Sequence, residues 1–202
     1  MTQNKRKLKI IGITGGVGSG KTGVLDHLKE NYNCRIIVSD ELAKELCLKG
    51  RPCFKPLVKL LGKDVLASDG EIDRRIMASK IFADDSLRQK VNDIIHPAVR
   101  KEIEKIAAKE KKEGTTDFLF IEAALLIECG YGDFVDEMWY VYACESVRRE
   151  RLKASRGYTD EKCDSIMQSQ LSEEEFRRNS DFTIDNSGEW SDTFSQIRER
   201  IG

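Results

Sequence analysis

The chain has 202 residues, a formal net charge of −1 and charged side chains at 34% of its positions. That length accommodates one α/β core with added segments, and the balanced charge provides no basic field of the kind that binds nucleic acid or an anionic membrane surface. The six cysteines show no C-x-x-C spacing, which argues against a zinc site or a disulfide framework. The apolar stretch that ends at Gly15 is too short for a signal peptide or a membrane span, so we expect a cytoplasmic protein.

A glycine-rich segment, residues 15–22, follows the first predicted strand at residues 8–14. Its spacing, G-x-x-x-x-G-K-[ST], lets successive backbone N–H groups point at one anion beside the start of the next helix. The ammonium of Lys21 would then reach the β- and γ-phosphates of a nucleotide, and the hydroxyl of Thr22 would ligate Mg²⁺. The residues predicted to bind the nucleotide here are Gly16, Val17, Gly18, Ser19, Gly20, Lys21 and Thr22.

The same segment also fits a dinucleotide-binding pattern, G-x-G-x-x-G, through Gly18, Gly20 and Gly23, with Asp40 downstream for a ribose hydroxyl. In that pattern the first glycine makes the turn directly after the strand. Gly18 comes four residues after the strand ends at Thr14, so the phosphate-binding loop of a kinase is the better interpretation.

The second predicted strand, residues 34–38, is followed by Asp40. In an open parallel sheet the ligands bind beyond the carboxyl ends of the strands, so this carboxylate would face the same crevice as the loop. It could orient an acceptor hydroxyl and take its proton. Alternatively, Ser39 or Asp40 is the N-cap of the helix that follows, and the residues alone leave both interpretations open.

Nearly eighty residues without a strand pattern follow, although a crossover needs only a dozen. Helical patterns occupy residues 40–48, 54–61, 72–82, 86–95 and 98–112, with Pro97 separating the last two. We interpret the excess as a helical insertion, residues 49–114, that holds a substrate.

Three further strands are predicted at residues 118–123, 138–143 and 181–185, which completes a five-stranded parallel sheet flanked by helices. Glu122 ends the third strand at the same edge as the loop. Its carboxylate could hold Mg²⁺ directly or through water, or it could be an ordinary charge at a strand end.

Residues 145–180 form a second insertion that is dense in charge. Ser172 and Glu175 are spaced as a capping box, and Glu173 and Arg177 as an i, i+4 pair, so these acids need no catalytic role. Most of the charges would form a solvated helical face. The arginines of the first helix could instead close over the triphosphate as the cations of a mobile lid.

Taken together, these motifs resemble the dephospho-coenzyme A kinase family over nearly the whole chain. The family's second-strand D-A-D resembles Val38-Ser39-Asp40, and its D-x-P-L-L-x-E is similar to residues 122–128. The other matching motifs are Asp69-Gly70, Arg74-Arg75, Ile81-Phe82, His96-Pro97 and Ile184-Asp185-Asn186-Ser187-Gly188. The resemblance implies phosphorylation of the ribose 3'-hydroxyl of dephospho-coenzyme A by Mg²⁺-ATP, giving coenzyme A and ADP.

The resemblance also implies three domains: a nucleotide-binding core (residues 1–48, 115–144 and 181–202), a substrate domain (residues 49–114) and a lid (residues 145–180). Asp40, Lys21 and Arg151 would be catalytic, Asn186 would lie near the adenine of ATP, and Thr22 and Glu122 would hold the metal. The residues implied on the substrate side are Arg74, His96, Leu125 and Glu128. ATP and dephospho-coenzyme A would be the partners, without nucleic acid or membrane, and the chain would be a monomer or a weak homo-oligomer.

Some positions depart from the family pattern. Val38 replaces the first aspartate of D-A-D, Ala124 replaces a proline, and Phe176 stands where relatives commonly have a basic residue. In the lid, the arginine that follows Arg151 is Arg156, displaced by one position and so by about 100° on a helix. Arg149, Arg151 and Arg156 are all candidates for phosphate contact, whereas Arg148 is expected in solvent.

Two alternatives remain. Another small-molecule kinase, acting on a nucleoside or a metabolite hydroxyl, would keep the phosphate-binding loop and the lid but not the context of His96-Pro97 and Asp185-Asn186. A non-enzymatic nucleotide switch of the GTPase type would need an N-K-x-D segment, and the sequence has none.

Overall fold

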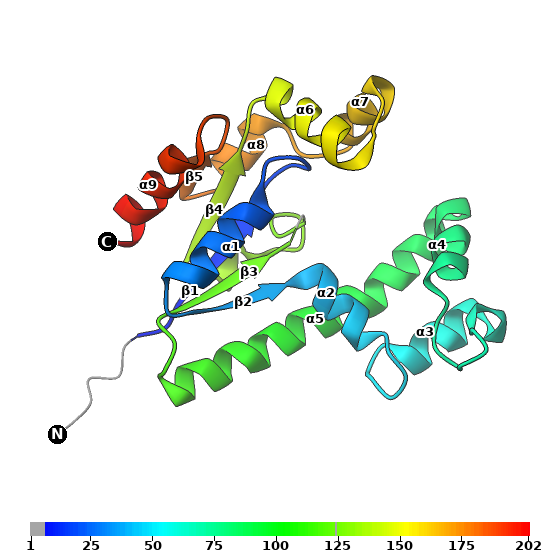
Figure 1. Ribbon diagram of the computed structural model, residues 1–202. Coiled ribbons are helices and arrows are strands. Elements are labelled where there is room, and N and C mark those ends of the chain that lie inside the picture. Colours follow the sequence, from blue (N-terminus) through cyan, green and yellow to red (C-terminus); the bar gives the residue numbers. More distant parts are fainter. Residues whose placement is uncertain (1–6, 124) are drawn as a thin grey trace. The chain divides into compact units, whose positions relative to one another are not determined.

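The computed structural model describes residues 7–123 and 125–202. Its centre is a five-stranded parallel sheet with the strand order β2-β3-β1-β4-β5 (Figure 1). The strands are β1 (Lys9–Thr14), β2 (Cys34–Val38), β3 (Phe118–Glu122), β4 (Glu137–Tyr142) and β5 (Phe182–Asp185). All five predicted strands are confirmed, and their ends differ from the predicted ones by at most one residue.

The central strand, β1, provides much of the core. Its side chains Ile10, Ile11 and Ile13 are at most 1% exposed, as expected for a strand that helices cover on both faces. Each such burial contributes about 1.5–3 kcal/mol to folding. The parallel register pairs Ile13 with Glu122 of β3, so Glu122 lies beside the point where β1 ends and the glycine-rich loop begins.

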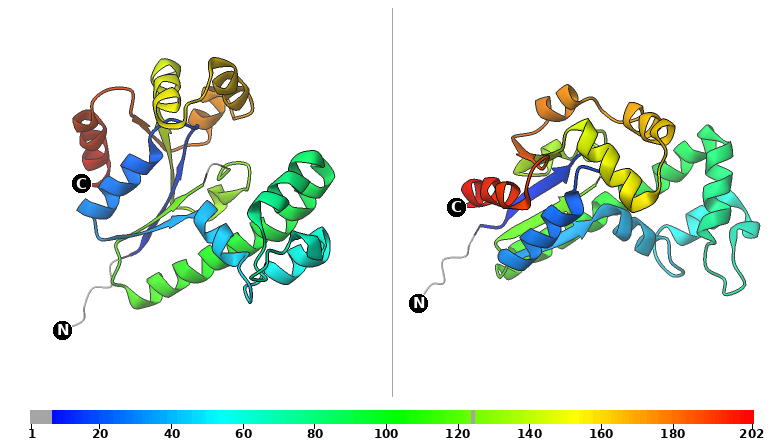
Figure 2. Two further views of the ribbon diagram at one scale, coloured as in Figure 1. Left: turned by 45° about the vertical axis from the view of Figure 1, so that its right-hand side comes forward. Right: turned by 45° about the horizontal axis from the view of Figure 1, so that its top comes forward.

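Two helices lie side by side next to the sheet, α1 (Lys21–Asn31) and α9 (Trp190–Ile201), as Figures 1 and 2 show. The helix α1 buries Val24, Leu25 and Leu28 on one face. The ring of His27 stacks on Phe194 of α9 with 3.8 Å between the centroids. This packing holds α1, which directly follows the loop, against α9.

Three helices come from the second insertion: α6 (Glu145–Arg156), α7 (Asp160–Gln168) and α8 (Glu173–Arg178). The predicted capping box of Ser172 and Glu175 starts α8, and the ion pair between Glu173 and Arg177 forms at 2.8 Å. Phe176 is 3% exposed and stacks nearly parallel on the ring of Tyr140 in β4, with centroids 4.8 Å apart. Its departure from the family pattern therefore serves packing against the sheet.

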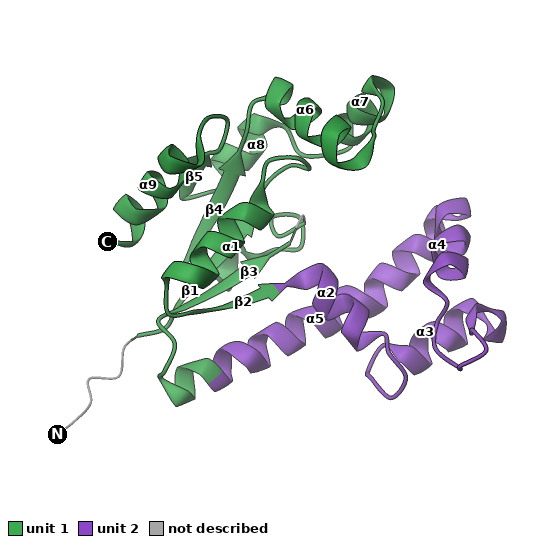
Figure 3. Ribbon diagram, viewed as in Figure 1, with its two compact units in different colours: residues 1–37, 110–202 green, residues 38–109 purple. Residues whose placement is uncertain are grey.

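The chain divides into two compact units (Figure 3). The first contains residues 7–37 and 110–202, with the sheet and α6–α8, and the second contains residues 38–109. The second unit is helical, with α2 (Ser39–Leu46), α3 (Phe54–Leu61), α4 (Arg74–Ala83) and most of α5 (Asp85–Glu113). This helical unit, residues 38–109, overlaps the predicted insertion, residues 49–114, and the division into three domains stays a prediction.

The predicted break at Pro97 is wrong, because α5 continues through this proline for 29 residues in all. A proline inside a helix costs about 3 kcal/mol, since it removes one hydrogen bond and crowds the preceding turn. The buried side chains Val91, Val99 and Ile103 keep helical spacing across Pro97 and are 0–6% exposed. Their burial on one continuous face offsets that cost. Within the described residues, no helix is long and apolar enough to cross a membrane.

Candidate active site

The glycine-rich loop connects β1 to α1 in the shape that a phosphate cradle needs. Gly18 and Gly20 have φ angles of 80° and 94°, which favour glycine because other side chains are strained there. Gly20 is the N-cap of α1, in the left-handed region and without a side-chain cap. The first N–H groups of α1 and the positive end of its dipole are therefore directed at an anion in the loop.

Lys21 lies across the mouth of this loop. Its Nζ donates a hydrogen bond of 2.7 Å to the carbonyl of Gly15, and it is 3.8 Å from Oε1 of Glu122. Both side chains are only 13–15% exposed, so their charges interact in a poorly solvated place. The structure thus brings together a cation for phosphate and a carboxylate of the type that binds Mg²⁺.

Arg151 of α6 contacts the same loop from the other side. Its Nη1 donates to the carbonyl of Ser19 at 3.3 Å, and its Nη2 donates to the carbonyl of Asn186 at 3.0 Å. An arginine on α6 can reach Ser19 because α6 follows β4, the immediate neighbour of β1 in the sheet. The guanidinium therefore lies where a bound triphosphate would add negative charge.

Asn186, which follows β5, is fully buried and braces the loop. Its Nδ2 donates to the carbonyl of Ser19 at 2.7 Å, and its Oδ1 accepts a hydrogen bond of 3.0 Å from the hydroxyl of Thr193. A Cβ on Gly20 would lie 2.1 Å from this Nδ2, so a side chain at Gly20 would collide with the brace. The side chain of Asn186 thus supports the loop backbone.

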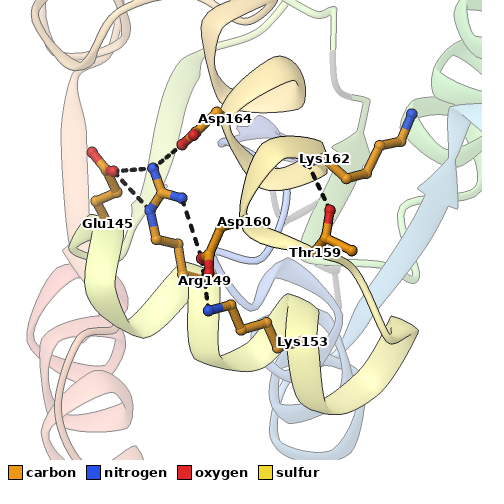
Figure 4. Close-up of polar contacts among 7 residues, drawn as sticks. All are labelled: Glu145, Arg149, Lys153, Thr159, Asp160, Lys162 and Asp164. Carbon is orange, nitrogen blue, oxygen red and sulfur yellow. Dashed lines mark hydrogen bonds and ion pairs between the residues drawn. The ribbon is translucent and has the colours of Figure 1, made fainter.

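Arg149 is occupied by carboxylates on α6 and α7 (Figure 4). It forms ion pairs with Glu145 at 2.6 Å, with Asp160 at 3.8 Å and with Asp164. Lys153 joins the cluster through Asp160 at 2.6 Å. Hydrogen bonds with Asp164 and Glu145 raise the pKa of the Arg149 guanidinium above its usual value. The cluster ties α6 to α7 and neutralises Arg149, which argues against a phosphate contact for this residue.

Arg156, the displaced arginine, is exposed at the end of α6. Its guanidinium carbon lies 5.8 Å from the centroid of the Tyr158 ring. The hydroxyl of Ser155 donates to the carbonyl of Arg151 at 2.6 Å within the same helix. Of the three candidate arginines, Arg151 is the one whose hydrogen bonds in the described structure reach the loop.

The expectation that Arg148 lies in solvent is wrong. Its side chain is half-buried, and Nε donates to the carbonyl of Val17 in the loop at 2.9 Å. Burial lowers the pKa of its guanidinium below the usual value. The charge pattern of α6 could not reveal this contact, because Arg148 and Arg149 are adjacent and helix rotation alone sends one to the loop and the other to α7.

The structure also bears on Asp40, in the second unit. The helix α2 begins at Ser39, and its N-cap is Val38, without a side-chain cap bond. The N-cap interpretation of Ser39 or Asp40 is therefore wrong: Asp40 lies in the first turn of α2 with its side chain exposed. Its role as a catalytic carboxylate stays a prediction.

With this geometry established, comparison with known proteins identifies the family. A family model for dephospho-CoA kinase matches residues 9–192. The chain belongs to the dephospho-CoA kinase family. It is 34% identical to dephospho-CoA kinase of Geobacter sulfurreducens over 194 residues, 96% of this chain and 95% of the relative. It is 36% identical to dephospho-CoA kinase of Aquifex aeolicus over 193 residues, 95% of each chain.

A solved structure shares the fold. The crystal structure of TT1252 from Thermus thermophilus superposes with a TM-score of 0.80 at 25% identity, covering 97% of both chains. The predicted α/β fold, a five-stranded parallel sheet of the P-loop kinase type, is therefore confirmed, and so is the resemblance to the dephospho-CoA kinase family.

The residues expected on the substrate side of this dephospho-CoA kinase family member fall in both units. Arg74 begins α4 and His96 lies within α5, both in the second unit and both exposed. Leu125 and Glu128 follow β3 in the first unit and are also exposed. Exposure is what a substrate contact requires, and their roles stay predictions. The departure at Ala124 lies outside the described residues.

Besides the contact of Arg148, sequence reasoning missed that of Gln170 with the loop. Its Oε1 accepts a hydrogen bond of 3.1 Å from the backbone N–H of Val17. It lies between α7 and α8 in a segment without a motif. The separation of 153 residues means that no local pattern could connect it to the loop.

Proposed function

We propose that this chain transfers the γ-phosphoryl group of ATP to the ribose 3'-hydroxyl of dephospho-coenzyme A. The products are coenzyme A and ADP, the last step of coenzyme A biosynthesis. The observation that carries the proposal is the loop of residues 15–22, with Lys21 and Arg151 at it, in a chain whose family match spans residues 9–192. The enzyme would act in the cytoplasm, as a monomer or a weak homo-oligomer.

The residues of the first unit suit the triphosphate of ATP. The loop N–H groups and the start of α1 bind the β- and γ-phosphates, and Lys21 exchanges its bond to the Gly15 carbonyl for a phosphate oxygen. Arg151, beside the carbonyl of Ser19, adds a second cation as charge develops on the bridging oxygen. Both cations act most strongly in the transition state, so they raise turnover more than they tighten ATP binding.

Asp40 is the proposed base. The 3'-hydroxyl oxygen attacks the γ-phosphorus, the bond from the γ-phosphorus to the bridging oxygen breaks, and the hydroxyl proton passes to the Asp40 carboxylate. The exposed position of Asp40 in the first turn of α2 leaves this carboxylate free of a capping bond. Arg74, His96, Leu125 and Glu128 would bind the acceptor.

The oxygen donors at the loop fit Mg²⁺. Thr22 presents an exposed hydroxyl in the first turn of α1, and the carboxylate of Glu122 lies near Lys21 at the loop mouth. Hard oxygen ligands of this kind, with phosphate oxygens, are what Mg²⁺ prefers. When bound, the ion neutralises charge on the β- and γ-phosphates. Glu122 would hold it directly or through water.

An acceptor panel tests the proposal. Purified protein is incubated with ATP and Mg²⁺ and with dephospho-coenzyme A, adenosine, a nucleoside monophosphate or pantothenate, and ADP release is followed. The Lys21→Ala variant, purified identically, controls for contaminating kinases. We expect dephospho-coenzyme A to be preferred, ³¹P NMR to place the new phosphate on the 3'-oxygen, and EDTA to abolish turnover. Folded protein that phosphorylates another acceptor and leaves dephospho-coenzyme A unchanged would refute the assignment.

A further inference from the structure

Two side chains from residues 145–180 hold the backbone of one residue of the phosphate-binding loop, Val17. Nε of Arg148 donates to the carbonyl of Val17 at 2.9 Å, and Oε1 of Gln170 accepts from the N–H of Val17 at 3.1 Å. Nη2 of Arg148 also donates to the same Oε1 at 2.9 Å. The three hydrogen bonds form a closed ring, which we call the Val17 clamp. It joins α6, the segment after α7, and the tip of the loop.

We propose that Arg148 and Gln170 are positioning residues that keep the loop tip in the shape that binds ATP. The proposal rests on the proposed function, because it concerns the same nucleotide site. Val17 lies between Gly16 and Gly18, so the loop tip has little side-chain packing of its own to fix it. Hydrogen bonds to both the N–H and the carbonyl of Val17 fix the orientation of the two successive peptide groups on either side of its Cα.

The glycine at position 16 supports the inference independently. The φ angle of Gly16 is not in the left-handed region, so its backbone would accept an alanine. The three atoms nearest to a Cβ built there all belong to the guanidinium of Arg148, at 2.5, 2.7 and 3.0 Å. A Cβ at this position would therefore displace the Arg148 guanidinium from the clamp.

The electrostatics of Arg148 agree with a place beside phosphate. Within residues 7–123 and 125–202 it has no ion pair with a carboxylate, whereas Arg149 has three. The carboxylate of Glu145 offsets only part of the cost of burying this guanidinium, and a bound triphosphate would supply further negative charge. The clamp thus holds a fixed backbone and a partly compensated cation at the loop.

The clamp gives a specific prediction for nucleotide affinity. If the loop tip without the clamp keeps its competent shape about one-tenth of the time, the dissociation constant for ATP rises about tenfold. We expect Arg148→Ala, Gln170→Ala and Gly16→Ala each to have this effect, because each one opens the same ring. Arg148→Lys should also weaken binding, since an ammonium retains the charge but cannot donate to Val17 and Gln170 in the fixed geometry of a guanidinium.

The decisive experiment is a pair of double-mutant cycles read by calorimetric titration with ATP, alongside kcat, KM for ATP and the melting temperature. The two double variants are Gly16→Ala with Arg148→Ala, and Gln170→Ala with Arg148→Ala. We expect each to raise the dissociation constant for ATP about tenfold, whereas independent effects would multiply to about a hundredfold. The control is Glu150→Ala, an exposed α6 position, which should match wild type within about twofold. ATP binding needs no acceptor, so the result is independent of whether dephospho-coenzyme A is the substrate.

Two outcomes would overturn the clamp. Multiplicative effects in both cycles would mean that Gly16, Arg148 and Gln170 act separately. Gln170→Ala and Arg148→Lys near wild type, with Arg148→Ala impaired, would mean that Arg148 acts through charge alone. The Gly16→Ala change displaces only the flexible end of Arg148, so the folded state should survive it.

Discussion

Replacing Asn186 with alanine tests whether this residue supports the loop or only contacts the nucleotide. The side chain is fully buried and bonds to the carbonyl of Ser19 at 2.7 Å and to the hydroxyl of Thr193 at 3.0 Å. In the Asn186→Ala variant the carbonyl of Ser19 keeps only the 3.3 Å bond from Arg151. We therefore expect a loss of stability even without ATP.

The magnitude follows from the two bonds. Leaving the buried carbonyl of Ser19 poorly paired costs about 1–3 kcal/mol. The hydroxyl of Thr193 keeps two contacts of 3.5 Å with backbone carbonyls, so the loss of its bond to Asn186 adds only about 0.5–1.5 kcal/mol. The free energy of unfolding should fall by about 1.5–4.5 kcal/mol, which lowers the melting temperature by roughly 3–18 °C in a chain of this size.

Equilibrium unfolding in urea and thermal melting, both without nucleotide, measure this loss. The matched control is Asn179→Ala, an exposed asparagine after α8 that donates to the carbonyl of Glu175 at 2.8 Å. We expect it to cost less than about 1 kcal/mol. If Asn186→Ala is as stable as the control and only KM for ATP rises, the bracing role is refuted and Asn186 acts by contacting the nucleotide.

Four further predictions concern chemistry and pH. Lys21→Ala should lower kcat about a thousandfold or more with the fold retained, since it removes a cation from the transferring phosphoryl group; unchanged kcat would contradict the role of the loop. Asp40→Asn should lower kcat by roughly a hundredfold to ten-thousandfold while ATP still binds, and near-normal turnover would exclude Asp40 as the base. Arg151→Ala should lower kcat about a hundredfold or more, and Arg156→Ala should stay within about twofold in the same assay; equal small effects would mean that neither acts on phosphate. Burial raises the pKa of Tyr140 from 10 to about 12, so the folded chain keeps a proton that the unfolded chain loses, and the free energy of unfolding should fall as pH rises between about 10 and 12. Unfolding in urea, repeated at several pH values over that range, should show that the free energy of unfolding of Tyr140→Phe depends less on pH. An unchanged dependence on pH would contradict the shifted pKa.

Much of the fold could be predicted from the sequence because its signals are local. A strand covered on both faces needs a continuous apolar run, so β1 and its neighbours are recognisable one by one. The loop of residues 15–22 is equally local, since its glycines, Lys21 and Thr22 are all consecutive or nearly so. The family resemblance added the order of the remaining motifs, and the family match over residues 9–192 confirmed it.

The tertiary structure decided what depends on distant partners. A charged residue on α6 can meet solvent, a carboxylate or the loop, and which of these it meets depends on where α7 and the loop pack around the helix. In that packing, Arg149 forms an ion pair with Asp164. Arg151 donates to the carbonyl of Ser19, and Arg148 donates to the carbonyl of Val17. Tertiary packing also lets α5 continue through Pro97. Burial of Val99 and Ile103 on a continuous face outweighs the local preference of proline to end the helix. The sequence by itself determined which groups are available for phosphate chemistry, and only the packing of segments up to 167 residues apart decided which of them hold the loop.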